Sequence, residues 1–401
     1  MTKDDPQPSR VAGSGRSGRA PLGWLRRILG RGSQGAPSEA ERWPVIQIEI
    51  TSRCLMQCVF CPNKTVGQQW QHGDLRWEDF RDHIGPHLSR FDLAYLQGWG
   101  EPLLHPHLWD MIRMVKSAGC RVGFTTCGSL LNEENGRRLV DEGIDILSIS
   151  FAGASPAIHE SLRVGSDLKQ LVSNVEKLAA QRKGRQGQAL PGKQGQGQAL
   201  PLLELHFLML QSNMHELPEF VRLAASLGAD EVAATNLTFT PTREIEAMRV
   251  FGRTPDPKQQ AIVAASQQEA ERLGIRFRAY PLTMDDNILE CDAHPTESVF
   301  VNHLGEITPC VMVGAPIRDL IPRFFEGESC PTPPVSLGNA RAGLIEAMQG
   351  QARARFSAPF QARKAFAYSA LALSAASGMG NDLRLPEPPH PCRHCYKHYG
   401  V

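Results

Sequence analysis

Three cysteines in one short segment are the residues of this sequence best suited to metal chemistry. Cys54, Cys58 and Cys61 are spaced C-x3-C-x2-C and follow directly on an apolar run at residues 45–50. A structural zinc site takes four protein ligands, so three thiols leave one position open. A cubane iron–sulfur cluster held by three thiolates likewise leaves one iron open, and that iron can bind a substrate or cofactor. An incomplete site at the end of a strand therefore indicates chemistry more than scaffolding.

Four further cysteines lie toward the C-terminus, at Cys291, Cys310, Cys392 and Cys395. Four thiolates satisfy a zinc ion, and they equally complete one closed iron–sulfur cluster, so the residues alone leave both alternatives open. Clustered cysteines in a chain of this length favour metal ligation in a reducing compartment over disulfides. Cys330, in a proline-rich segment, is either a loop thiol or a substitute ligand.

The composition is that of an ordinary globular protein. The chain has 401 residues, of which 41% are hydrophobic and 21% charged, with a net charge of +1. This balance gives no electrostatic reason to expect a nucleic-acid partner. The start of the chain has no apolar core of signal-peptide length, and no run of about 18 apolar residues occurs. The sequence therefore predicts no membrane span and a cytoplasmic location.

Strand-length apolar runs alternate with stretches of helical periodicity over the first half of the chain. The apolar runs lie at 45–50, 92–97, 121–125, 145–151, 203–209 and 231–237, and the helical stretches at 76–89, 107–118, 132–142, 168–181 and 215–227. Alternation at this spacing predicts βα units around a parallel sheet, because parallel strands need crossover helices. The pattern does not decide between a barrel and an open sheet.

The ends of five consecutive predicted strands carry polar or thiol groups. The cysteine triplet follows the first strand, and Gly98-Trp99-Gly100-Glu101-Pro102 follows the second. Thr126-Cys127-Gly128 follows the third strand, Ser150 ends the fourth, and Gln211-Ser212-Asn213 follows the fifth. Small polar residues are common in any one such loop. Together with a cysteine triplet they indicate a site, because the carboxyl ends of parallel strands meet at one rim.

These motifs resemble the radical S-adenosylmethionine (SAM) superfamily over about residues 44–238. The resemblance rests on the triplet, with Phe60 before its last cysteine, and on Gly100-Glu101-Pro102 after the second strand. Downstream, Cys291-x13-Gly305-x4-Cys310 and Cys392-x2-Cys395 are similar to the SPASM and shorter twitch extensions. The resemblance implies an α/β fold, with a partial (β/α)6 TIM-type barrel and a small C-terminal α+β domain that binds an auxiliary cluster.

The resemblance also implies roles for single residues. Cys54, Cys58 and Cys61 would hold a [4Fe–4S] cluster whose fourth iron is chelated by SAM. The four C-terminal cysteines would hold one auxiliary [4Fe–4S] cluster. Residues matching the family's SAM contacts are Phe60, Gly98, Gly100, Glu101, Pro102, Ser150 and Arg163.

The implied activity is reductive cleavage of SAM to a 5′-deoxyadenosyl radical, which abstracts hydrogen from a substrate. Its partners would be a low-potential donor of the flavodoxin or ferredoxin type and a peptide, protein or cofactor precursor. The Gly98–Pro102 stretch and the closing Cys392–Gly400 run are similar to the tungsten-oxidoreductase cofactor maturases. The alternative class is a non-enzymatic metal-binding or electron-transfer module. No residue is identified as a catalytic acid or base.

Two positions depart from the family pattern. Trp99 stands where the family usually has glycine, and Cys127 stands where asparagine is common. A small buried thiol accounts for Cys127 more simply than a ligating one.

Four regions are expected along the chain. They are a basic disordered tail at 1–42, a core at 43–240 with a low-complexity insertion at 182–201, a connecting helix (257–273) and strand (275–280) within 241–290, and a cluster domain at 291–401. The last region should hold a hairpin at 298–310 and a helix near 340–350.

Overall fold

The structure is a computed structural model that describes residues 42–184, 201–377 and 384–401. The predicted tail, apart from Arg42, and most of the predicted insertion lie outside these residues. No helix in the described part of the chain combines the length and apolarity needed to cross a membrane.

One mostly parallel sheet organises the described residues, and it is open. Its order is β14 (Gly338–Asn339), β11 (Glu306–Thr308), β10 (Ser298–Val301), β1 (Trp43–Ile48), β3 (Phe91–Tyr95), β4 (Arg121–Thr126), β5 (Ile146–Phe151), β7 (Leu202–Met209), β8 (Glu231–Asn236) and β9 (Arg276–Ala279). The strands from β10 to β9 are parallel, whereas β11 pairs antiparallel with both of its neighbours, β10 and β14. All six predicted strands are present, which confirms the α/β prediction. The outermost strands, β14 and β9, do not pair, so the barrel is not closed.

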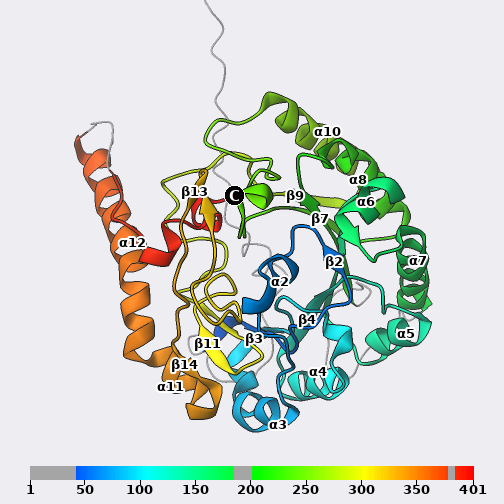
Figure 1. The fold of residues 1–401 in the computed structure, drawn as a ribbon, viewed down its shortest axis with the longest axis horizontal. Helices are drawn as coiled ribbons and strands as arrows, with labels where there is room; N and C mark the ends of the chain where they lie inside the picture. The colour runs from blue at the N-terminus through cyan, green and yellow to red at the C-terminus, as the bar shows by residue number, and fades with distance from the viewer. Residues whose placement is uncertain (1–41, 185–200, 378–383) are drawn as a thin grey trace, which may run out of the picture. The chain divides into compact units, whose positions relative to one another are not determined.

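The predicted helices follow their strands. They are α4 (Leu108–Ser117), α5 (Glu133–Asp141), α7 (Leu168–Gly184), α8 (Leu217–Ser226) and α10 (Pro257–Leu273), and they lie along the outer side of the curved sheet (Figure 1). The stretch predicted at 76–89 is an irregular helix, formed by α3 (Trp77–Asp79), the π-helical η3 (Phe80–Ile84) and the 3-10 helix η4 (Gly85–Arg90). Pro86 interrupts this stretch because proline has no N–H to continue the α-helical hydrogen bonds.

Shorter elements complete the described chain. They are β2 (Gln57–Cys58), β6 (Arg163–Val164), β12 (Phe324–Phe325), β13 (Glu328–Ser329), α2 (Pro62–Thr65), α6 (Pro156–Leu162), α9 (Arg243–Glu246), α11 (Leu344–Gln349) and α12 (Gln351–Ser377), with 3-10 turns η2 (Gly67–Gln69), η5 (Pro102–Leu104), η6 (Met214–Glu216), η7 (Ala340–Ala342), η8 (His390–Cys392) and η9 (Tyr396–Tyr399).

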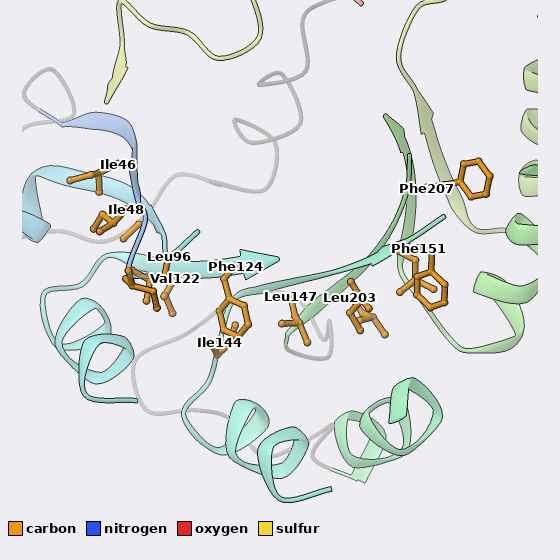
Figure 2. Packing of buried hydrophobic residues seen from close by; sticks show 14 of the residues in the cluster. Ile46, Ile48, Leu96, Val122, Phe124, Ile144, Leu147, Phe151, Leu203 and Phe207 are labelled. Atoms are coloured by element: carbon orange, nitrogen blue, oxygen red, sulfur yellow. The ribbon is translucent and has the colours of Figure 1, made fainter. Parts of the chain in front are cut away.

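The two faces of the sheet differ in polarity. Alternate residues such as Val122, Phe124 and Leu147 are fully buried between the strands and the helices (Figure 2). The other face carries polar side chains. There the Tyr95 hydroxyl lies 2.9 Å from Ser148 Oγ, which donates to Glu204 Oε2 at 2.8 Å. Parallel sheets covered on both faces usually have apolar strands throughout. The polar face therefore bounds a space suited to a polar ligand.

The predicted hairpin is confirmed, and it belongs to the main sheet. β10 pairs in parallel with β1, and β11 returns antiparallel to β10. The sheet thus continues past residue 291, where a separate cluster domain was expected to begin.

The helix predicted near 340–350 is present as α11, but the long helix α12 after it was not predicted. Its attachment to the rest of the protein depends partly on charged side chains. Arg353 donates to the Ser298 carbonyl at 3.0 Å, and Arg363 donates to the Ile288 carbonyl at 2.7 Å. Such contacts leave no apolar periodicity for a sequence pattern to detect.

Candidate active site

The cysteine triplet lies in the loop between β1 and α2. Cys58 is in the two-residue strand β2, and its partner across the antiparallel pair with β6 is Arg163. Cys61 directly precedes α2, whose first residue is Pro62. The Cys61 N–H donates to the Cys58 carbonyl at 3.1 Å, which holds the second and third cysteines on one turn. The structure therefore joins the triplet to a strand about 100 residues further along the chain.

Burial and neighbouring charges set the protonation of these thiols. Burial raises the pKa of Cys61 to about 12 and also raises the pKa of Cys58. Arg163 and Lys64 act in the opposite direction on both thiols, since a positive charge favours thiolate. A hydrogen bond with Cys127 lowers the pKa of Cys54. All three cysteines pack in one cluster with Phe60 and Cys127.

Arg163 is the predicted SAM-binding residue that the structure places most clearly. It is 7% exposed, and its Nε has no hydrogen-bond partner among the described residues. The turn after it is fixed because His159 Nε2 lies 3.0 Å from Ser166 Oγ. A buried guanidinium with an unused donor, beside thiols, fits an anionic group bound at the triplet.

The Gly98–Pro102 loop packs directly against the segment after β1. A Cβ on Gly98 would lie 2.4 Å from the Glu49 side chain, and one on Gly100 would lie 2.2 Å from the Thr51 carbonyl oxygen. Both glycines are therefore required by contacts within the protein. Asn63 fastens the loop from α2, because its Nδ2 donates to the Ser52 carbonyl at 2.5 Å and to the Trp99 carbonyl at 3.1 Å.

Glu101 holds the loops after β3 and β4 together. Its carboxyl oxygens accept from Thr126 Oγ1 and the Cys127 N–H, each at 2.7 Å, and from the Leu103 N–H at 3.1 Å. Burial raises its pKa well above the ordinary range. The carboxyl group of Glu101 is thus occupied by contacts within the protein, and Pro102 after it begins η5.

Ser150 and Phe60 are also at the expected rim. Ser150 is half-buried in β5, opposite His206 of β7 in the parallel register. His206 Nε2 lies 3.3 Å from Glu204 Oε2. Burial acts to raise the pKa of Glu204, but hydrogen bonds from His206 and Ser148 lower it overall. Phe60 is buried among the triplet cysteines.

The structure also brings the four C-terminal cysteines into one neighbourhood. Burial raises the pKa of Cys310 to about 11, and the pKa values of Cys291 and Cys392 well above the ordinary range; nearby cysteines add to each shift. Arg323 lies beside two of them and donates to the carbonyls of Pro391 (2.7 Å) and Met312 (2.6 Å). For Cys330 the neighbouring charges are carboxylates, those of Glu328 and Glu246.

A cavity of about 200 Å³ opens at the ends of β8 and β9. Its lining residues are Thr235, Asn236, Thr238, Tyr280, Lys397 and Val401. Lys397 Nζ contacts both oxygens of Asp292 at 2.8 and 2.9 Å, and the Tyr280 hydroxyl donates to Asp292 Oδ2 at 2.6 Å. Asp292 directly follows Cys291, so the cavity adjoins the C-terminal cysteines.

Sequence reasoning missed several residues of this site. Asn63 directly follows Cys61-Pro62, and this position next to the triplet could have identified it from the sequence. Glu49 and His303 gave none, because their contact joins positions 254 residues apart. In the described part of the chain, no three Cys, His, Asp or Glu side chains converge on a single metal ion. The cysteines of a cubane each bind a different iron, so they need not converge in that way.

The fold and the site together define a class: α/β proteins with three thiols after the first strand of a parallel sheet. Residues 48–185 match the Radical SAM superfamily model. This part of the chain is therefore similar to radical SAM domains, and the match spans the triplet, the Gly98–Pro102 loop, Ser150 and Arg163.

The chain is similar to curated proteins at low identity. The chain is 27% identical over 197 residues to the tungsten-containing aldehyde ferredoxin oxidoreductase cofactor-modifying protein of Pyrococcus furiosus, covering 48% of this chain and 51% of the relative. It is 26% identical over 223 residues to the mycofactocin maturase MftC of Mycobacterium ulcerans, covering 55% and 52%. The chain thus spans about half the length of these relatives.

Solved structures support the fold. The chain is similar to native anSMEcpe with bound AdoMet and Cp18Cys peptide, with a TM-score of 0.54, 12% identity and coverage of 89% of this chain and 96% of that one. It is also similar to Streptococcus suis SuiB bound to precursor peptide SuiA, with a TM-score of 0.52, 10% identity and coverage of 73% and 70%.

Proposed function

We propose that this protein is a radical SAM enzyme that matures a peptide, protein or cofactor precursor. The observation that carries the proposal is the assembly of Cys54, Cys58 and Cys61 in one buried cluster, with Arg163 opposite Cys58 and the Gly98–Pro102 loop fastened beside them. A [4Fe–4S] cluster on these thiolates, with SAM on its open iron, would supply the electron that cleaves SAM to methionine and a 5′-deoxyadenosyl radical.

The protein's own residues bind and orient the reactants. Arg163 and Lys64 favour the thiolate forms that bind iron, because both act to lower the pKa values of Cys58 and Cys61. The unused Nε of Arg163 is suited to the SAM carboxylate, and Ser150 to the ribose. The backbone of the Gly98–Pro102 loop would meet the SAM amino group, and Phe60 would lie beside the adenine. The outer helices and the apolar layer beneath the sheet exclude water from one side of the site.

We also propose a partial (β/α)6 barrel with a twitch-like C-terminal region over 291–401. The burial of Cys291, Cys310 and Cys392, their mutual electrostatic effects and the fixed position of Arg323 support one auxiliary [4Fe–4S] cluster on those thiols and Cys395. Four protein ligands leave no open iron, so this cluster is suited to passing an electron. A single zinc ion on the same thiols is the competing assignment.

A low-potential flavodoxin or ferredoxin is the proposed electron donor. Three side chains beside the triplet are exposed although apolar: Leu55 (51%), Val59 (40%) and Val164 (44%). Their backbones lie together, because β2 pairs with β6 and the Val59 N–H donates to the Leu162 carbonyl at 3.1 Å. Exposed apolar groups gathered beside a redox centre favour a docking site for a protein donor.

A cofactor-maturation role in tungsten enzymes is a second candidate for the substrate. It is supported by the similarity to the Pyrococcus furiosus protein, together with the Gly98–Pro102 stretch. A peptide substrate is favoured instead by the similarity to MftC and to the PqqA peptide cyclase of Rhodopseudomonas palustris, the latter 26% identical over 197 residues. A precursor-peptide gene or a tungsten-oxidoreductase gene beside this one would distinguish the two.

The test is to remove each cysteine set separately. Anaerobically reconstituted protein should contain about eight irons per chain, as two cubanes. Cys58→Ala should lose about four of them and all SAM cleavage under chemical reduction. The pair Cys392→Ala and Cys395→Ala should lose about four irons but keep SAM cleavage. Cys330→Ala is the matched control and should lose neither. Zinc at the triplet, or no SAM cleavage by iron-replete protein, contradicts the proposal.

A further inference from the structure

A buried acid–base pair connects the Gly98–Pro102 loop to the C-terminal hairpin. Glu49 is fully buried, and His303, in the turn between β10 and β11, is 6% exposed. Nδ1 of His303 lies 2.9 Å from Glu49 Oε2. A carboxylate only accepts hydrogen bonds, so the imidazole N–H is the donor here. The His303 backbone N–H adds a second, longer contact at 3.4 Å.

The other carboxylate oxygen of Glu49 reaches the SAM loop. Glu49 Oε1 accepts from the Trp99 N–H at 2.9 Å. The Glu49 carboxylate therefore joins Trp99 of the loop to His303 of the hairpin, which leads to Cys310. Gly73 leaves room for the imidazole, since a Cβ there would lie 3.0 Å from His303 Cδ2.

The Trp99 side chain makes a second connection between the same two parts. Its indole packs edge-to-face with Trp70 (6.0 Å between ring centroids) and Phe239 (5.1 Å). The surrounding apolar cluster contains Cys310 and Cys395. The backbone and the side chain of Trp99 are thus both held, one through Glu49 and His303, and the other by residues around the C-terminal thiols.

We propose that Glu49 and His303 are positioning residues that set the SAM-binding loop from the C-terminal hairpin. This inference rests on the proposed function, because it assigns the loop to SAM. Without His303, the buried Glu49 carboxylate loses its charge-assisted partner and must find another or become hydrated. Either response moves the carboxylate away from the Trp99 N–H. The loop then samples more conformations, and SAM binding must restore one of them.

The experiment compares four variants in iron-replete protein: His303→Leu, His303→Asn, Glu49→Gln and the double variant Glu49→Gln with His303→Leu. SAM is the titrant, and the readout is the change it causes in the electron paramagnetic resonance spectrum of the reduced protein. His303→Leu should weaken SAM binding about tenfold, the effect of losing one charge-assisted hydrogen bond. His303→Asn should recover most of the loss, because its amide nitrogen occupies nearly the position of Nδ1.

The double variant tests whether the effect passes through Glu49. If it does, adding His303→Leu to Glu49→Gln weakens binding by much less than tenfold. His215→Gln, at an exposed histidine, is the control and should bind SAM like the wild type. Iron content and the thermal midpoint are measured for every variant, so that a variant that folds poorly is recognised. If His303→Leu folds poorly, the SAM affinity of His303→Asn decides the question instead.

Two failures are distinguishable. If the wild type binds no SAM, the proposed function is wrong. Suppose that the wild type binds SAM, and that His303→Leu and Glu49→Gln are folded, iron-replete and bind SAM equally well. The positioning role is then wrong, and the proposed function stands. Unchanged affinity with a lowered thermal midpoint would mean that the pair only stabilises the fold.

Discussion

Replacing Trp99 by phenylalanine and by glycine tests how this residue is held. Trp99 is half-buried, and its Nε1 has no hydrogen-bond partner among the described residues. Removing a buried tryptophan side chain costs about 3–5 kcal/mol, and each edge-to-face pair contributes about 0.5–1.5 kcal/mol beyond buried area. Because Trp99 is partly exposed, Trp99→Gly should lower the free energy of unfolding by about 3 kcal/mol, the low end of that range.

Trp99→Phe should cost about half as much as Trp99→Gly, roughly 1.5 kcal/mol, because less buried volume is lost. A phenyl ring keeps both edge-to-face neighbours, Trp70 and Phe239. It removes part of the half-buried indole surface and an N–H that has no acceptor among the described residues. The assay is anaerobic urea unfolding of iron-replete protein, with the slope of the transition checked for each variant. If Trp99→Phe costs as much as Trp99→Gly, the reasoning is refuted. The indole N–H would then have an acceptor in the loaded protein, such as a cluster sulfur.

Two further predictions concern pH and electron supply. Burial, with a smaller effect of Arg163, lowers the pKa of His159 to about 3 from its ordinary 6.5. Only the unfolded imidazole takes up a proton between these values, so the free energy of unfolding falls as pH falls, by about 1.4 kcal/mol at pH 5.5. In urea titrations between pH 7.5 and 5.5, the free energy of unfolding of His159→Gln should fall by about 1.4 kcal/mol less than that of the wild type. Equal falls in the two proteins would contradict this prediction. The double variant Leu55→Asp with Val59→Asp should slow SAM cleavage several-fold when reduced flavodoxin supplies the electron, as expected for a docking surface. Cleavage driven by dithionite should keep its rate. Equal slowing of both reactions would assign these residues to the cluster loop itself.

The fold was predictable where each element carries its own pattern. The six predicted parallel strands, β1, β3, β4, β5, β7 and β8, are apolar runs. Helix α10 begins at the Asp256-Pro257 cap, where the Asp256 side chain accepts from the Lys258 N–H. Where an element is attached through polar contacts, apolar periodicity does not reveal it. Helix α12 is held in part by arginine side chains on carbonyls, so its sequence showed no stripe. The place of β10 beside β1 was also hidden, because local sequence does not encode which distant strand will pair.

The site divides in the same way. The triplet, Gly98–Pro102 and the closing Cys392-x2-Cys395 are local motifs, so sequence reasoning could single them out. The residues that fix those motifs come from elsewhere in the chain. His303 reaches Glu49 across 254 positions. Arg163 was named from the family resemblance, but its pairing with Cys58 through a two-residue strand pair was not predicted. Such residues have no spacing rule, since only the folded chain brings them together.

The loop after β3 shows why tryptophan is tolerated where the family usually has glycine. Gly98 and Gly100 both face the segment after β1, where a Cβ would meet Glu49 or the Thr51 carbonyl. Trp99, between them, directs its side chain to Trp70 and Phe239 instead. Residues 98–100 form a bend, and the crowding against the segment after β1 falls at positions 98 and 100. Position 99 faces the C-terminal part of the protein, where an indole adds contacts beside Cys310 and Cys395. The substitution therefore keeps the geometry of the loop and gives it an additional attachment that glycine cannot provide.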